Sequence, residues 1–311
     1  MTGTTETRGS SPGAPGSTGF TRDTVPDTAP ATAAAPGYRA AATLPLRVEA
    51  VRQFLRRRTL ITFAVMGILP VVIWAAFTLG GTPDGRDRES SLLDVATSSG
   101  VNFSLAAIFV SSGFLLTVPV ALFFGDTVAS EAGWSSLRYL LTAPVSRARL
   151  LFSKMTVALA FSAAAVVLLP AVALGVGSLA YGWGDLELTT AGSLPADTAV
   201  GRLGVIVVYV FVSQLTVAGF AFWLSTVTDA PLGAVGGAVG ATILSNILDS
   251  ITALGSLRDF LPTHWQYAWA DALQPDAEWA GMIKGTSLSA SFAVVFFALA
   301  FRHFGRKDIV S

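Results

Sequence analysis

The sequence predicts an all-α integral membrane protein with about six membrane-spanning helices, on the grounds of composition and of the length of its apolar runs. Over 311 residues, 52% are hydrophobic and only 13% are charged, and the mean hydropathy is +0.61. About 25% of the residues are charged in a typical soluble domain. Several apolar stretches reach about 20 residues, which is the length of a helix that crosses the hydrocarbon core. A transmembrane barrel would need alternating segments of about 10 residues, and these stretches do not alternate.

The composition excludes several classes of site. The chain has no cysteine and only two histidines, so a disulfide, a thiolate nucleophile and a cysteine or histidine metal cluster are not expected. The G-x-x-x-x-G-K-S/T phosphate loop is absent from the sequence. We therefore expect no catalytic residue, no metal and no cofactor on this chain, and no nucleic-acid partner. The energy for any transport must come from a partner protein or from an ion gradient.

The first part of the chain differs in character from the rest. Residues 1–43 are rich in Gly, Ser, Thr, Pro and Ala, and we expect a disordered cytoplasmic tail because they cannot bury enough apolar surface. Residues 44–311 are expected to form the membrane domain. Within residues 44–58, apolar side chains recur at helical spacing and the cations lie mostly elsewhere on the wheel. This pattern predicts a short interfacial helix whose cations face anionic lipid headgroups; a plain positive-inside anchor is a compatible alternative.

The membrane spans follow in order. They are predicted at residues 60–79, 103–124, 155–180, 203–227, 232–254 and 282–301. We expect Pro70 to bend the first span, and Pro170 and Gly175 to interrupt the third. Residues 255–280 hold many aromatic side chains, which is typical of a membrane interface.

The cations are segregated along the chain and predict its orientation. One set lies in residues 44–58, in the loop between the second and third spans and at the C-terminal end: Arg47, Arg52, Arg56, Arg57, Arg58, Arg138, Arg147, Arg149, Lys154, Arg302, Arg306 and Lys307. The opposite loops hold only Arg86, Arg88, Arg202, Arg258 and Lys284. The positive-inside rule therefore places both termini and the central loop in the cytoplasm of a cell-membrane protein.

Residues 125–154 form this central loop and have a helix–break–helix pattern. Ser135 can cap a short helix over residues 136–142. Pro144 ends that helix because the residue before a proline is pushed out of the α region, and Ser146 can cap the next helix. The apolar stripe of the short helix consists of Leu137, Leu140 and Leu141. We interpret the loop as a rigid cytoplasmic lever on which another protein docks.

The loop resembles the loop signature of ABC exporter permeases of the second type, the ABC-2 type. The residues that carry the resemblance are Asp126, Glu131, Gly133, Leu137, Leu140, Leu141, Pro144, Val145, Ser146, Arg147, Leu150, Leu151 and Lys154. The resemblance implies the permease subunit of an ATP-driven exporter, with a second permease copy or a paralogue beside it. Its short coupling helix would sit in a cleft of a separate ATP-binding subunit, which would hold ATP and Mg.

In that family setting, Glu131 and Arg138 are candidates for ion pairs with the ATP-binding subunit, and Arg147 for orienting the loop. The alternative is that the loop cations only follow the positive-inside rule and that Asp126 and Glu131 pair with them inside the chain. The cations concerned are Arg138, Arg147, Arg149 and Lys154.

Two further features lie in the spans. Gly233, Gly236, Gly237 and Gly240 form two overlapping G-x-x-x-G spacings, which let backbones approach closely; we expect packing between helices of one chain rather than between subunits. Gln214 and Asn246 are polar residues in apolar surroundings, and such residues often line a pathway.

Two rival function classes remain. An ion-coupled secondary transporter would need ionisable residues deep in the spans and inverted repeats, and neither is evident. A non-transporting membrane scaffold would not explain why the central loop has the pattern of an ordered cytoplasmic lever. The substrate stays open among peptides, drugs, lipids, ions and polysaccharides.

Overall fold

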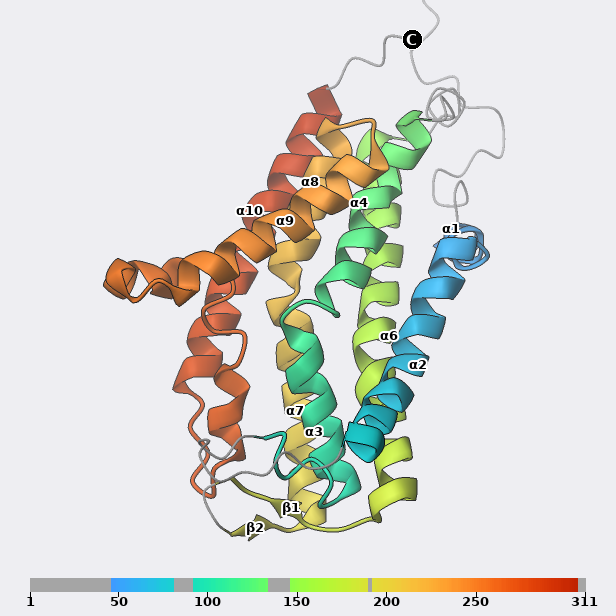
Figure 1. The fold of residues 1–311 in the computed structure, drawn as a ribbon. Helices are drawn as coiled ribbons and strands as arrows, with labels where there is room; N and C mark the ends of the chain where they lie inside the picture. Colours follow the sequence, from blue (N-terminus) through green and yellow to red (C-terminus); the bar gives the residue numbers. More distant parts are fainter. Residues whose placement is uncertain (1–45, 81–91, 134–145, 190–191, 307–311) are drawn as a thin grey trace, which may run out of the picture. The chain divides into compact units, whose positions relative to one another are not determined.

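Helices account for most of the computed structural model, which describes residues 46–80, 92–133, 146–189 and 192–306 (Figure 1). The α-helices are α1 (Leu46–Phe54), α2 (Arg57–Gly80), α3 (Gly100–Ser112), α4 (Thr117–Gly133), α6 (Arg147–Tyr181), α7 (Ala196–Ser213), α8 (Leu215–Val227), α9 (Pro231–Ser250) and α10 (Ala280–Arg306). Two 3-10 helices, η2 (Thr252–Phe260) and η3 (Ala268–Leu273), lie between α9 and α10. The strands β1 (Leu186–Glu187) and β2 (Ser193–Leu194) pair antiparallel.

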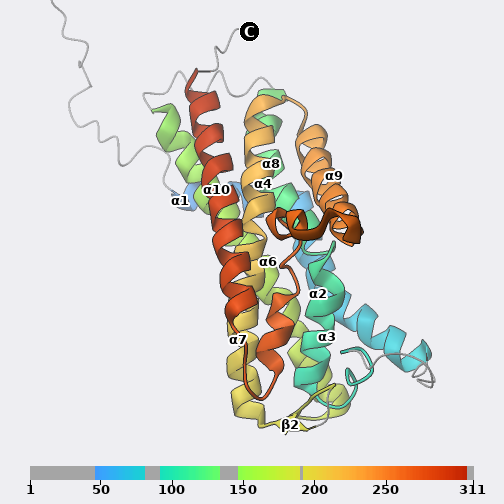
Figure 2. The ribbon, with the colours of Figure 1, turned by 90° about the vertical axis from the view of Figure 1, so that its left-hand side faces the viewer.

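The long helices are of membrane-spanning length and composition. Five of the described helices are long and apolar enough to cross a membrane, when α7 and α8 are counted as one helix. The number rises to six if α3 and α4 together form one bent span. The prediction of about six spans is thus confirmed. Helix α10 packs along α8 and α7 (Figure 2), whereas α9 runs obliquely to its neighbours (Figure 1).

The bundle has two distinct ends. We call the end at which α4 ends and α6 begins the loop end; α10 finishes there too, with Arg147 Nη1 donating to Gly305 O at 3.4 Å. The opposite end, which carries β1 and β2, is the hairpin end (Figure 1). There Asn102 ties α3 to the hairpin: its Nδ2 donates to Glu187 O at 2.8 Å, and its Oδ1 accepts from Glu187 N at 3.0 Å.

The predicted span at residues 103–124 is not one straight helix. It breaks between α3 and α4, whose axes differ by 52°. Pro119 has no amide hydrogen for the carbonyl of residue 115, so a helix running through residues 113–116 would lose that hydrogen bond. At the break, Leu116 N instead reaches back to Ser111 O at 3.0 Å. The second predicted span therefore consists of two half-helices joined by a bend.

The third span shows the opposite deviation. Pro170 and Gly175 were expected to interrupt it, but α6 continues through both as one helix of 35 residues. The Pro170 carbonyl accepts a hydrogen bond from Ser104 Oγ of α3 at 3.0 Å. At 1.5 Å per residue the helix is about 52 Å long, which exceeds a hydrocarbon core of about 30 Å, so α6 extends beyond the apolar layer.

A close helix contact through glycine lies where no motif predicted it. A Cβ on Gly177 of α6 would stand 2.8 Å from Phe103 Cβ and 3.0 Å from Gly100 Cα, so the α3–α6 contact requires glycine on both helices. Of the predicted packing glycines in α9, Gly237 meets another helix, with Leu224 Cδ1 at 2.9 Å. The prediction of packing within the chain is wrong for Gly236 and Gly240, beside which the described chain leaves open space.

A third glycine of α9 is equally uninvolved in packing between helices. A Cβ on Gly233 would meet only Ala230 and Thr228, in the turn just before α9. The close α4–α9 approach depends instead on Gly125 of α4, where a Cβ would stand 2.8 Å from Val235 Cγ2.

The chain between α9 and α10 is an ordered segment anchored at the hairpin end. Helix α9 stops at Ser250, earlier than the predicted end of the fifth span at residue 254. Trp269 of η3 is fully buried, so this aromatic side chain belongs to the protein core rather than to a membrane interface. Arg202 of α7 holds the end of η3, donating to Ala272 O at 2.9 Å and Pro275 O at 3.3 Å.

Candidate functional site

Helix α1 packs its polar edge, not its apolar face, against α4 and α6. Glu49 is only 4% exposed, whereas Leu55, just past the end of the helix, is 67% exposed. Gln53 is buried next to Glu49 and donates to its Oε1 at 2.8 Å. The expectation that the cations of this segment face lipid headgroups is wrong for Arg52, Arg56 and Arg58, because all three pair with carboxylates of the chain.

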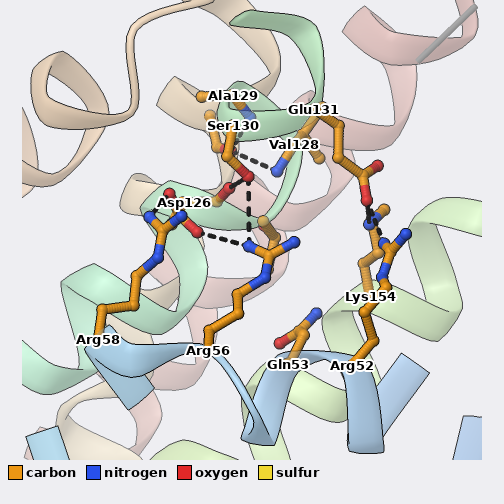
Figure 3. A network of polar contacts seen from close by, with 12 residues as sticks. Arg52, Gln53, Arg56, Arg58, Asp126, Val128, Ala129, Ser130, Glu131 and Lys154 are labelled. Carbon is orange, nitrogen blue, oxygen red and sulfur yellow. Dashed lines mark hydrogen bonds and ion pairs between the residues drawn. The ribbon is translucent and has the colours of Figure 1, made fainter. Parts of the chain in front are cut away.

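Lys154 joins three helices at the loop end (Figure 3). Its side chain comes from α6 and is 1% exposed. Its Nζ lies 2.6 Å from Glu131 Oε1 of α4 and 3.1 Å from Glu49 Oε1 of α1. Arg52 also pairs with both carboxylates. Burial raises the pKa of the Glu49 carboxyl. The charges of Lys154 and Arg52 and the hydrogen bonds from Gln53 and Lys154 together outweigh burial, so the pKa lies below its usual value.

Asp126 anchors the second half of the same network. Its Oδ2 accepts a hydrogen bond from Arg56 Nη1 at 2.9 Å, and its carboxylate also forms an ion pair with Arg58 (Figure 3). We call the whole set the loop-base cluster: Glu49, Arg52, Arg56, Arg58, Asp126, Glu131 and Lys154. Three buried carboxylates of α1 and α4 thus pair with four cations, which come from α1, the turn after it, α2 and α6. Buried charges are tolerated when they are paired in this way.

The hydroxyl of Ser225 connects the loop end of α4 to α8. Ser225 of α8 accepts hydrogen bonds from the amides of Val128 and Ala129 of α4, each at 3.0 Å. These two amides lie inside α4, one turn before Glu131, so the loop end of α4 is fixed both to α1 and α6 and to α8.

The structure brings together three of the residues that the sequence singled out: Asp126, Glu131 and Lys154. Their partners lie inside the chain, as the alternative interpretation held, but most of the cations come from α1 and the start of α2 rather than from the loop. Gly133 is the last residue of α4, and Arg147 is the first of α6. Ser146 occupies the predicted cap position of α6, but its side chain makes no capping hydrogen bond. The remaining predicted docking residues lie outside the described residues: Leu137, Arg138, Leu140, Leu141 and Pro144.

Sequence reasoning missed the contribution of α1 to this cluster. Glu49 and Arg52 are three residues apart and therefore share a helix face, and the run of arginines at 56–58 directly precedes the first span. Those signals indicated that the helix of this segment has a charged edge. They did not show that α4 would supply the acidic partners, because the pairing joins residues about 70 to 105 positions apart.

A cavity of about 180 Å³ forms a second candidate site, at the level of the α3–α4 break. Its walls come from the start of α4, from the α7–α8 junction, from α9 and α10, and from the segment that follows η2. Polar lining residues are Thr117, Ser213, Gln214, Thr216, Thr242, Ser245, Thr263 and Gln266. Apolar ones are Val217, Phe220, Ala238, Ala241, Pro262, Phe292 and Phe296.

Gln214 connects this cavity to the helix break. Its Oε1 accepts a hydrogen bond from Thr117 Oγ1 at 3.3 Å, and its Nε2 lies 3.5 Å from Ser112 O. One side chain therefore bridges the end of α3 and the start of α4. Asn246 does not line the cavity but supports it, because its Oδ1 accepts from Gln266 Nε2 at 2.9 Å. Within the described ranges, no group of three or more Asp, Glu or His side chains could hold a metal ion.

Comparison with known proteins gives one finding for this chain. The sequence model of a family described as "ABC-2 family transporter protein" matches residues 52–243. The matched stretch begins in α1, ends in α9 and includes every residue of the loop-base cluster except Glu49. A search among curated proteins finds no match.

Proposed function

The chain belongs to the ABC-2 family of transporter proteins, and from that premise we propose that it is the permease subunit of an ATP-driven exporter. The family is that of the membrane component rather than of the ATPase, and the helices give a multi-pass membrane protein. In the proposed complex a separate ATP-binding subunit supplies ATP and Mg, and a second permease copy or a paralogue completes the membrane part. The loop end faces the cytoplasm, with both termini on that side.

The observation that carries the proposal is the loop-base cluster. Helix α4 ends at Gly133 and α6 begins at Arg147, so these two helices flank residues 134–145 of the sequence. The two helices at this base are joined by the Lys154–Glu131 pair, and both are joined to α1. A base fixed in this way does not splay when the loop is pushed, so a force on the loop moves α4 and α6 as a unit.

The path from that base into the bundle supports the same function. Ser225 fixes the loop end of α4 to α8, and the 52° break between α3 and α4 offers a place where the span can bend. The cavity lies at that break. A displacement that starts at the loop would therefore change the shape of the cavity. Export requires such a change in a site within the membrane domain.

Replacing Leu140 by Asp should uncouple the exporter. We expect the ATPase rate of the ATP-binding subunit, stimulated by the reconstituted chain, to fall at least tenfold, which corresponds to about 1.4 kcal/mol. The reason is that a carboxylate placed in an apolar docking contact would be buried without a partner. We choose Leu140 rather than Glu131 because Glu131 is buried in the loop-base cluster. A substitution of Glu131 would disturb folding, so a loss of activity in that variant would not test docking.

The matched control is Leu140→Met, a volume-conserving exchange that should keep the stimulation. Both variants should unfold at the temperature of the parent chain and reach the membrane in equal amounts. Full stimulation by the folded Leu140→Asp variant would refute docking through this loop.

A further inference from the structure

We propose that the cavity at Gln214 binds an uncharged molecule with an apolar or aromatic body and one amide or hydroxyl group, and that it rejects anions and cations. That this molecule belongs to the class of the transported substrate rests on the proposed function. The binding itself does not, because it depends only on the walls of the cavity.

The walls of the cavity are uncharged and have a polar part and an apolar part. None of the fifteen described lining residues is charged, and eight of them carry a hydroxyl or an amide. The apolar part includes Phe292 and Phe296, whose rings stack at 6.1 Å. Phe296 stacks in turn on Trp223 at 6.1 Å. Phe292 and Phe296 give one side of the cavity an apolar aromatic surface, which suits a ring or a short aliphatic body.

A charged ligand would find no counter-charge in this cavity. Removing a charge from water without a partner is strongly unfavourable. The nearby ionisable groups of α9 and the following segment pair with one another: His264 Nδ1 lies 2.6 Å from Asp249 Oδ1, and Arg258 Nε 3.4 Å from the same oxygen. Neither Asp249 nor His264 lines the cavity. The walls therefore favour a neutral molecule.

Two polar groups on the wall are poorly satisfied. The contact of Gln214 Nε2 with Ser112 O, at 3.5 Å, is at the limit of a hydrogen bond. The hydroxyl of Thr216 is buried and has no hydrogen-bond partner in the described part of the chain. By contrast, Ser245 and Thr263 bond each other at 2.7 Å. Buried polar groups normally have partners, so Gln214 is the group that an amide or hydroxyl of a ligand would engage.

The volume limits the size of that ligand. About 180 Å³ exceeds the share of a water molecule, about 30 Å³, and an engineered cavity of about 150 Å³ in another protein accepts benzene. A single ring with one small substituent is therefore the right scale. A ligand amide that engages Gln214 would also compete with Ser112 and Thr117, which links occupancy to the α3–α4 break.

Three probes of one shape test the charge rule: benzamide is neutral, benzoate is an anion and benzamidinium is a cation. Because the chain has no cysteine, the Ser213→Cys variant carries a single thiol on the cavity wall. We expect benzamide to slow the alkylation of that thiol by N-ethylmaleimide at least threefold at millimolar concentration. Benzoate and benzamidinium should leave the rate within the error of the measurement.

Controls separate binding in the cavity from general effects. A Ser193→Cys variant places the thiol on the exposed hairpin, and its alkylation should be unaffected by all three probes. Adding Gln214→Leu to Ser213→Cys should raise the benzamide concentration needed for half-protection about tenfold. Gln214→Met, which removes the amide but keeps a side chain of similar length, should also raise it about tenfold, and it keeps the test usable if Gln214→Leu does not fold.

The proposal is overturned if benzoate or benzamidinium protects as well as benzamide, if none of the probes protects, or if the Ser213→Cys thiol is not alkylated at all. Because the assay uses the full chain without any ATP-binding subunit, its outcome is independent of coupling. Protection by benzamide together with full ATPase stimulation by the Leu140→Asp variant would support binding in the cavity and refute docking through the loop.

Discussion

Replacing Lys154 by Met is expected to lower the free energy of unfolding by about 3–5 kcal/mol, the usual effect of removing one partner from a buried ion pair. Lys154 Nζ contacts Glu49 and Glu131, and methionine would fill the space without offering a charge. Both carboxylates would then depend on Arg52, which is 42% exposed at its side chain. Unfolding of the detergent-solubilised chain by denaturant, followed by tryptophan fluorescence, measures the loss.

The control for this substitution is Arg302→Met, which removes an exposed cation of α10. It should change the free energy of unfolding by no more than about 0.5 kcal/mol. Adding Glu131→Gln to Lys154→Met should recover part of the loss, because it removes a carboxylate that has lost its main cation. If Lys154→Met costs no more than Arg302→Met, the loop-base cluster does not hold α1, α4 and α6 together.

Replacing Trp269 by Ala should destabilise the chain by about 3–5 kcal/mol, as for other large-to-small core substitutions of Phe or Trp. The indole is 0% exposed and belongs to the hydrophobic core. Its loss would leave a cavity beneath the segment that Arg202 holds to α7. The same denaturant titration measures the effect, and hydrogen exchange of residues 268–273 should show that this segment opens first.

Trp279 provides a matched comparison, because it belongs to the same inter-helix segment but is 41% exposed. Trp279→Ala should cost less than about 1 kcal/mol. Equal losses for the two variants would mean that the burial of Trp269 does not anchor the segment.

Much of the fold followed from hydropathy, because backbone hydrogen bonds in lipid must be satisfied within a helix. The positions of the spans and the start of α6 at Arg147 came out close to their predicted places. Proline was the weak point. Pro170 sits inside a continuous helix, whereas Pro119, inside the second predicted span, accompanies the α3–α4 break. A proline removes the hydrogen bond to the carbonyl four residues earlier, and the sequence alone does not show whether tertiary packing offsets that loss.

The two candidate sites differ in how far the sequence revealed them. Gln214 was expected to line a pathway because an amide in an apolar span is rare, and it does line the cavity. Thr216 and Thr242 were not singled out, since a hydroxyl in a span usually bonds its own helix backbone, as Thr242 does. Asp126 and Glu131 were recognised as a significant acidic pair, but their partners on α1 and α2 depend on tertiary packing.

The most direct test of the exporter assignment is ATP hydrolysis in three matched sets of vesicles: the chain alone, the ATP-binding subunit encoded beside it or purified with it, and both together. We expect no hydrolysis by the chain alone, a basal rate for the ATP-binding subunit, and a several-fold higher rate for the pair. We further expect that only the pair drives ATP-dependent uptake of the substrate into inside-out vesicles. Hydrolysis by the chain alone, or substrate transport in vesicles that lack any ATP hydrolase, would contradict the assignment.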